Sequence, residues 1–270
     1  MDLGLSGRAC VVTGASRGLG RATARTLCAE GADVLLVARS EDRLIEAADE
    51  CASAGEAAGG RAESLAIDVT QPEAADRIVR EADERLGSLD ILVNNAGTAR
   101  RRDLDDVPDE DWYAAWELNV MAPMRLMRSA APPMGDRGWG RIVNVSSSSG
   151  KRPSAATPEY SVAKAAELSL SRLFADRHAA RGVLINAICP GAVNSELWTE
   201  EGGLLDQTME MEGLSSREEA LEAASAGRPI GRIAEIDEIA GAIVFLCSEQ
   251  ASYTSGAAWS VDGGVVQIII

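Results

Sequence analysis

Short apolar runs alternate with longer amphipathic stretches along almost the whole chain. The runs are rich in β-branched residues and show no polar face, which is typical of strands buried on both sides of a parallel sheet. The longer stretches carry apolar residues at the helical period. This pattern predicts strands at residues 9–13, 34–37, 65–67, 91–93, 142–145, 183–188 and 257–261.

Helices are expected between these strands, at residues 18–30, 41–54, 72–86, 109–134, 159–180 and 235–248. Strands and helices that alternate in this way favour an α/β fold, the doubly wound Rossmann arrangement. We therefore expect one nucleotide-binding domain over residues 1–270, with a seven-stranded parallel sheet flanked by helices.

One acidic and irregular segment, residues 194–228, separates the sixth strand from the last helix. Insertions at this point lie outside the carboxyl ends of the strands, where ligands bind in such folds. We expect a substrate lid here, and a surface helical insertion without a catalytic role is the alternative. Trp198, Met209 and Met211 would give the lid an apolar wall, or would belong to the core.

The chain has 270 residues and a formal net charge of −16. A surface this acidic repels a phosphate backbone and an acidic membrane, so neither nucleic acid nor a membrane is expected as a partner. The first residues lack the features of a signal peptide, and no apolar run reaches ~18–20 residues. We expect a cytoplasmic protein.

The cysteines Cys10, Cys28, Cys51, Cys189 and Cys247 are odd in number, widely spaced and free of any C-x-x-C pattern. Such spacing argues against a disulfide framework and against a zinc site, so no metal is expected. The single histidine, His178, stands in a polar helical stretch and is expected at the surface rather than in catalysis.

A glycine-rich loop follows the first predicted strand and opens the first helix. Gly14, Gly18 and Gly20 have the spacing G-x-x-x-G-x-G. Glycines allow the backbone to turn sharply and approach a pyrophosphate, and the helix N-terminus offers free N–H groups. The loop, which also contains Ser16, Arg17 and Leu19, is therefore predicted to bind a dinucleotide cofactor. A turn needed for packing alone is the alternative.

The end of the second strand distinguishes NAD from NADP. NAD enzymes place an acidic residue there, bonded to the ribose 2′-hydroxyl, whereas this chain has Ala38 followed by Arg39. Arg39 and Arg17 could grip a 2′-phosphate through charge-assisted bonds. We expect NADP(H) as the preferred cofactor, with NAD(H) as the alternative.

Tyr160 and Lys164 are four residues apart and would share one face of a helix. A neighbouring ammonium favours the phenolate and would lower the pKa of Tyr160, which makes the tyrosine a usable general acid or base. Ser147 follows the fifth strand, and its hydroxyl can bond a substrate oxygen. These three residues predict proton transfer to or from a carbonyl or alcohol oxygen.

With these motifs in order, the chain resembles the short-chain dehydrogenase/reductase family along its whole length. Further matching pieces are Asp68-Val69, Asn94-Asn95-Ala96-Gly97, Asn119 and Pro190-Gly191. The resemblance implies that Asp68 and Val69 hold the adenine. It also implies cofactor contacts from a wider set, Asn95, Ala96, Gly97, Tyr160, Lys164, Pro190, Gly191, Val193 and Ser195.

The resemblance further implies that Asn119 fixes a water in a proton relay through Lys164. It implies a homotetramer, in which the helices that begin near residues 109 and 159 form a dimer bundle. Within the family, 3-oxoacyl-thioester reductases are the most similar members. The expected function is hydride transfer between NADP(H) and a small-molecule carbonyl or secondary alcohol, with 3-oxoacyl thioesters as candidate substrates.

Three alternatives stay open at this point. One is an NAD(H)-dependent dehydrogenase of a sugar, steroid or other alcohol. A second is a cofactor-sensing protein without catalysis, and a third is an epimerase or dehydratase on the same scaffold. The basic residues at 100–102 and 151–152 could attract an anionic substrate, or could pair with nearby Asp103, Asp105 and Asp106.

Overall fold

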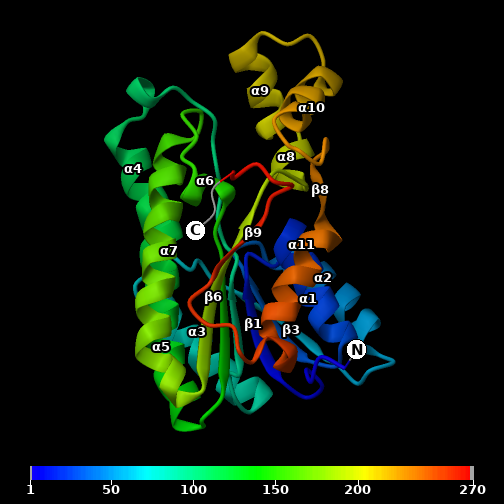
Figure 1. The fold of residues 1–270 in the computed structure, drawn as a ribbon. Helices are drawn as coiled ribbons and strands as arrows, with labels where there is room; N and C mark the ends of the chain where they lie inside the picture. The colour runs from blue at the N-terminus through cyan, green and yellow to red at the C-terminus, as the bar shows by residue number, and fades with distance from the viewer. Residues whose placement is uncertain (1, 268–270) are drawn as a thin grey trace.

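The computed structural model describes residues 2–267 and confirms the expected α/β fold (Figure 1). A seven-stranded parallel sheet runs through the centre, in the order β3-β2-β1-β4-β5-β6-β9. Its strands are β1 (Ala9–Thr13), β2 (Asp33–Ala38), β3 (Ala62–Ala66), β4 (Ile91–Asn94), β5 (Gly140–Val145), β6 (Val183–Pro190) and β9 (Ala258–Val261).

Helices cover both faces of the sheet, as Figure 1 shows. One face is covered by α1 (Gly18–Ala29), α2 (Glu41–Gly55) and α11 (Ile236–Cys247), and the other by α3 (Ala74–Leu86), α4 (Asp109–Trp116), α5 (Ala122–Asp136) and α7 (Pro158–His178). Successive strand residues point to opposite faces, so Val12 packs with the first layer and Val11 with the second. Central strands such as β1 and β4 are therefore buried along their whole length, whereas the edge strand β3 carries Glu63 and Ser64.

The strand order reverses between β1 and β4, which are neighbours in the sheet although β2 and β3 lie between them in the chain. The loops that leave β1 and β4 consequently diverge to opposite faces. A crevice opens between them at the carboxyl edge, which is where ligands bind in doubly wound sheets.

The long helix expected over residues 109–134 is not continuous. It consists of α4, a π-helical turn at Glu117–Met121, and α5, which extends to Asp136. Pro123 explains the interruption, since proline has no N–H to donate to the carbonyl four residues earlier, that of Asn119. Other element ends differ from expectation by a few residues; β3, for example, begins at Ala62 rather than 65.

The segment 194–228 contains three helices, α8 (Glu196–Thr199), α9 (Leu204–Glu212) and α10 (Arg217–Ala226). It stands above the carboxyl edge of the sheet, and the short strands β7 (Val193–Asn194) and β8 (Ala234–Glu235) pair at its base. In the part of the chain that the structure describes, no helix has the length and apolar content needed to cross a bilayer.

Candidate functional site

A large cavity of about 1670 Å³ lies at the carboxyl edge of the sheet. Its walls come mainly from the loops after β1, β2, β3, β4, β5 and β6, together with α7 and α8. The predicted cofactor residues line it, with the exception of Gly20: Gly14, Ser16, Arg17, Gly18, Leu19, Arg39, Asp68, Val69, Asn95, Ala96, Gly97, Tyr160, Lys164, Pro190, Gly191, Val193 and Ser195. Ser147 is also in the wall, whereas Asn119 is behind it.

The glycine loop leaves no room for side chains. Gly14 has a φ of +65°, and a Cβ there would stand 2.9 Å from the Cα of Ala96. A Cβ on Gly20 would collide with the carbonyl oxygen of Gly14, so Gly20 acts from beneath the loop. The first turn of α1 has no side-chain cap, which leaves its N–H groups open to an anion in the cavity.

Hydrogen bonds tie the end of β1 to the end of β4. The Thr13 hydroxyl accepts from the backbone N–H groups of Asn95, at 3.0 Å, and Ala96, at 3.1 Å. The Asn95 side chain in turn donates to the Thr13 carbonyl, at 2.9 Å. These bonds fix the two loops on either side of the crevice.

Three arginines stand at the end of the cavity formed by the loops after β1 and β2. Arg17, Arg39 and Arg43 all line it. The carboxylate of Glu200, from the loop after α8, pairs with Arg17 and stands 3.7 Å from Arg43. The positive charge predicted for a phosphate is thus present, and a carboxylate of segment 194–228 contacts it.

Asp68 lies at the same end of the cavity. Burial opposes its charge, but the N–H and hydroxyl of Thr70 donate to its carboxylate at 3.0 and 2.8 Å. These bonds, with the nearby charge of Arg39, bring the pKa of Asp68 below its usual value. Asp68 is therefore an anion at neutral pH and can accept a hydrogen bond.

Tyr160 and Ser147 meet at the other end of the cavity. Ser147 caps the short helix α6 (Ser148–Lys151) by accepting from the Ser149 N–H, at 3.1 Å. Burial raises the pKa of Tyr160 above its usual value, and the charge of Lys164 and a bond from Ser147 only partly offset this. The expectation of a lowered pKa is therefore wrong for this structure, because desolvation outweighs the ammonium.

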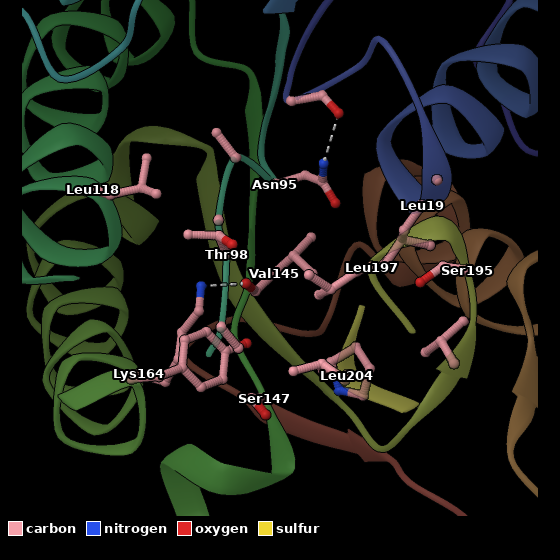
Figure 2. A pocket seen from close by; sticks show the side chains of 18 of the residues that line it. Leu19, Asn95, Thr98, Leu118, Val145, Ser147, Lys164, Ser195, Leu197 and Leu204 are labelled. Atoms are coloured by element: carbon pink, nitrogen blue, oxygen red, sulfur yellow. Dashed lines mark hydrogen bonds between the residues drawn. The ribbon is translucent and has the colours of Figure 1, made fainter. Parts of the chain in front are cut away.

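Lys164 is buried behind Tyr160, on the same face of α7. Its Nζ lies 5.7 Å from the centre of the Tyr160 ring and donates to the carbonyl of Val145 at 2.8 Å, as Figure 2 shows. It also donates to the carboxylate of Glu167, at 3.0 Å. Sequence reasoning missed Glu167, whose spacing of three residues from Lys164 was the available signal.

Asn119 lies in the π-helical turn and is 1% exposed. Its amide nitrogen donates to the Ala115 carbonyl at 2.9 Å, while its Oδ1 is buried without a partner. A Cβ on Gly97 would lie 3.2 Å from this oxygen and 3.8 Å from Lys164 Nζ. An acceptor and a donor thus face the same small space, which suits a bridging water.

Segment 194–228 closes the cavity on the side opposite Tyr160. Leu197 and Leu204 face the strand ends across the cavity in Figure 2, and Trp198 also lines the wall. Met209 and Met211 are not in the wall, and Met211 is exposed. Leu197, Trp198 and Leu204 therefore form the apolar wall, and the two methionines do not contribute to it.

The basic loop residues pair with partners other than the neighbouring aspartates. Arg101 pairs with Glu212 of α9 at 2.8 Å, and its backbone N–H donates to Gln207 at 2.7 Å. Arg102 pairs with Asp111 of α4. Arg101 and Arg152 line the cavity, so part of its rim is cationic.

His178 is 6% exposed and stacks on Phe174, so the expected surface position is wrong. Burial lowers its pKa, and the residue is not in the cavity wall. All the cysteines are buried and unpaired. Within residues 2–267, no three or more His, Cys, Asp or Glu side chains gather as a metal site would require.

The chain is similar to known proteins over its whole length. A family profile described as enoyl-(acyl carrier protein) reductase matches residues 14–266. The 3-oxoacyl-(acyl-carrier-protein) reductase of Vibrio cholerae is 32% identical over 98% of this chain and all of its own length. The D-beta-hydroxybutyrate dehydrogenase of Cupriavidus necator is 33% identical over 97% of this chain and 99% of its own.

Among solved structures, L-sorbose reductase from Gluconobacter frateurii, complexed with NADPH and L-sorbose, has a TM-score of 0.90 and 38% identity over all of both chains. Matches of this extent cover the segments that contain the glycine loop, the strand-end loops and the Tyr160–Lys164 pair. The chain belongs to the short-chain dehydrogenase/reductase family of NAD(P)-dependent oxidoreductases that act on alcohol and carbonyl groups.

Proposed function

We propose that this protein is an NADP(H)-dependent reductase that converts a small-molecule ketone to a secondary alcohol, with Tyr160 as the proton donor. The observation that carries the proposal is the joint placement of Tyr160, Ser147 and Lys164 in one cavity with the glycine loop. A cofactor-sensing protein would have no need of an acid backed by a buried ammonium.

The residues present fit a dinucleotide. The free N–H groups in the uncapped first turn of α1 suit the pyrophosphate. Gly14 packs closely against Ala96, and without a side chain there the pyrophosphate can approach the backbone. Asp68 and Val69 would hold the adenine, while Pro190, Gly191, Val193 and Ser195 would hold the nicotinamide amide. When bound, the reduced nicotinamide supplies a hydride to the carbonyl carbon.

The chain's own residues would polarise and protonate the carbonyl oxygen. Ser147 donates a hydrogen bond that polarises the carbonyl, and Tyr160 releases its proton to the oxygen as negative charge develops. Lys164 stabilises the resulting phenolate with its charge. The orphaned Oδ1 of Asn119 would hold a water that returns a proton through Lys164.

Arg17, Arg39 and Arg43 support NADP(H) over NAD(H). With Ala38 in place of an acidic residue, nothing at the end of β2 would repel a 2′-phosphate. The NADPH complex of the sorbose reductase, at 38% identity, is further support.

Two substrate classes are favoured by different observations. The 3-oxoacyl thioesters are favoured by the identity to the Vibrio cholerae reductase and by the cationic rim at Arg101 and Arg152, which suits an acidic carrier. Keto sugars are favoured by the higher identity to L-sorbose reductase. In either case segment 194–228 would act as the substrate lid, with Leu197, Trp198 and Leu204 against the substrate.

We also propose a homotetramer. The outer surfaces of α4 and α7 expose Tyr113, Trp116, Val162 and Leu173, which is unusual for a solvent face. These helices lie side by side, so two copies could pack them as a four-helix bundle. The sheet ends at β9, where Trp259 is 41% exposed and a second contact could form.

The first test is turnover with a Tyr160→Phe control. We expect oxidation of NADPH by a 3-oxoacyl thioester or a keto sugar, and a loss of at least ~10²-fold in kcat in the variant, because a positioned acid contributes that much or more. Cofactor affinity should change little. Tight NADPH binding without turnover of any ketone would contradict the proposal, as would full activity of Tyr160→Phe.

The proton on Tyr160 can be followed directly. Replacing Tyr113 and Tyr253 by Phe leaves Tyr160 as the only tyrosine. Since burial raises its pKa, the ultraviolet band of tyrosinate should appear only above pH ~10, the usual value for tyrosine. A band that grows below that pH would show that Lys164 outweighs burial. Tyr160→Phe in the same background gives the baseline.

Glu200→Gln should strengthen NADPH binding, because it removes the carboxylate that pairs with Arg17 and lies near Arg43. An exposed ion pair is worth about 0.2–1 kcal/mol, so a Kd lower by about 1.4- to fivefold is expected. The Kd for NADH, which lacks the 2′-phosphate, should not change. Glu201→Gln makes the same charge change beside it and serves as the control. Equal changes for both cofactors would contradict the role of these arginines.

Analytical ultracentrifugation tests the assembly. The wild type should sediment with four times the mass of the chain, and Val162→Arg with Leu173→Arg should reduce it to a smaller species. Buried arginines without partners would make the α7 contact unfavourable. Ile45→Arg, at an exposed apolar residue of α2 on the other face of the sheet, should leave the mass unchanged. A monomeric wild type would contradict the proposed tetramer.

A further inference from the structure

Glu167 forms a buried ion pair with Lys164 that lies behind the proposed proton donor. The side chains of Lys164 and Glu167 are 3% and 2% exposed, and Nζ lies 3.0 Å from Oε2. The two residues are one helical turn apart on α7, so the helix itself sets their separation. The Val145 carbonyl, at the end of β5, accepts a second bond from the same Nζ at 2.8 Å.

A carboxylate at this position is costly to bury. Glu167 faces the sheet, where α7 otherwise packs small residues such as Ala163 and Ser171. Desolvation raises the pKa of Glu167, and the charge and hydrogen bond of Lys164 oppose that rise. An apolar side chain would fill the same space without a desolvation penalty, so the carboxylate needs an explanation beyond packing.

The ion pair stabilises the charged form of Lys164. Burial alone would lower the pKa of Lys164, but Glu167 and then Tyr160 offset it, and the pKa lies above its usual value. The other titratable group that faces the pair is Cys189 of β6, whose pKa burial raises to about 11. Cys189 therefore stays a neutral thiol, and the charges of Lys151 and Asp262 act on its pKa in opposite directions.

We propose that Glu167 is a positioning residue that keeps Lys164 charged and fixed against the end of β5, behind Tyr160. An ammonium has three N–H donors, and Val145 and Glu167 take two of them. The third is left for the cavity side, where Lys164 forms part of the wall. Glu167 is not in the cavity wall, and its hydrogen bond goes to Lys164, so it would act mainly through that ammonium. Its own negative charge also raises the pKa of Tyr160, but less than the charge of Lys164 lowers it. The consequence for turnover rests on the proposed function.

The ionisation of Lys164 can be measured without any turnover. Lys151 and Lys164 are the only lysines in the sequence, so protein labelled with carbon-13 and nitrogen-15 in lysine gives two sets of side-chain signals. Lys151→Arg assigns them. In the wild type, the Lys164 signal should keep its protonated shift to pH values above ~10.4, the ordinary value for lysine.

In Glu167→Gln, which has the same size but no charge, Lys164 should lose its proton at a pH lower by at least ~1 unit, because desolvation is no longer opposed. Glu167→Asp keeps the carboxylate and should titrate closer to the wild type. Asp176→Asn is the matched control, since it removes an exposed carboxylate that pairs with Arg172 on the same helix. A Glu167→Gln protein that titrates with the wild type, or a control that shifts equally, would overturn the proposal.

The pH dependence of kcat/KM tests the consequence for turnover. Once Lys164 is neutral, the phenolate of Tyr160 loses its stabilising charge, so Glu167→Gln should lose at least ~10-fold activity at alkaline pH relative to neutral pH. An equal loss at every pH would mean a structural role only and would contradict the proposal. A wild-type protein that reduces no ketone would instead contradict the proposed function. The lysine titration would still show whether Glu167 keeps Lys164 charged, because it needs no turnover.

Discussion

A parallel sheet buried on both faces leaves only its strand ends and its two edge strands uncovered, and this constraint organises the molecule. Helices cover the faces, and the polar side chains and backbone groups of the site gather in the loops at the carboxyl ends of the strands. The order reversal between β1 and β4 separates their loops, and the bonds of Thr13 with Asn95 fix the separation. The glycine loop, Ser147 and Pro190 all reach the cavity because their strands end at this edge.

Much of this could be predicted from the sequence. The strands are recognisable because burial on both faces demands continuous apolar runs, and the glycine loop because it follows a strand and opens a helix. Tyr160, Ser147 and Lys164 were identified by spacing and by resemblance, and the structure brings all three to one end of the cavity. The identity of the family followed from the order of these motifs, and the comparisons confirm it.

The remaining features depend on contacts that spacing does not encode. Glu167, among alanines and serines, has the pattern of an exposed helical residue, and only the packing of α7 on the sheet buries it. Glu200 pairs with Arg17, although 183 positions separate the two residues in the sequence. One local feature of the sequence, Pro123, could have indicated the π-helical turn that contains Asn119. The raised pKa of Tyr160 depends on how completely the fold excludes water, which a charge four residues away cannot reveal.

Hydride transfer at this site is the central claim, and isotope transfer tests it most directly. NADPH carrying deuterium at both C4 positions of the nicotinamide would be incubated with a ketone and the purified protein, and the alcohol analysed by mass spectrometry and NMR. Direct transfer predicts deuterium on the carbinol carbon, and at least ~10²-fold slower formation of labelled alcohol when Tyr160 is replaced by Phe. Alcohol that forms without deuterium, or deuterium released to water, would contradict direct transfer.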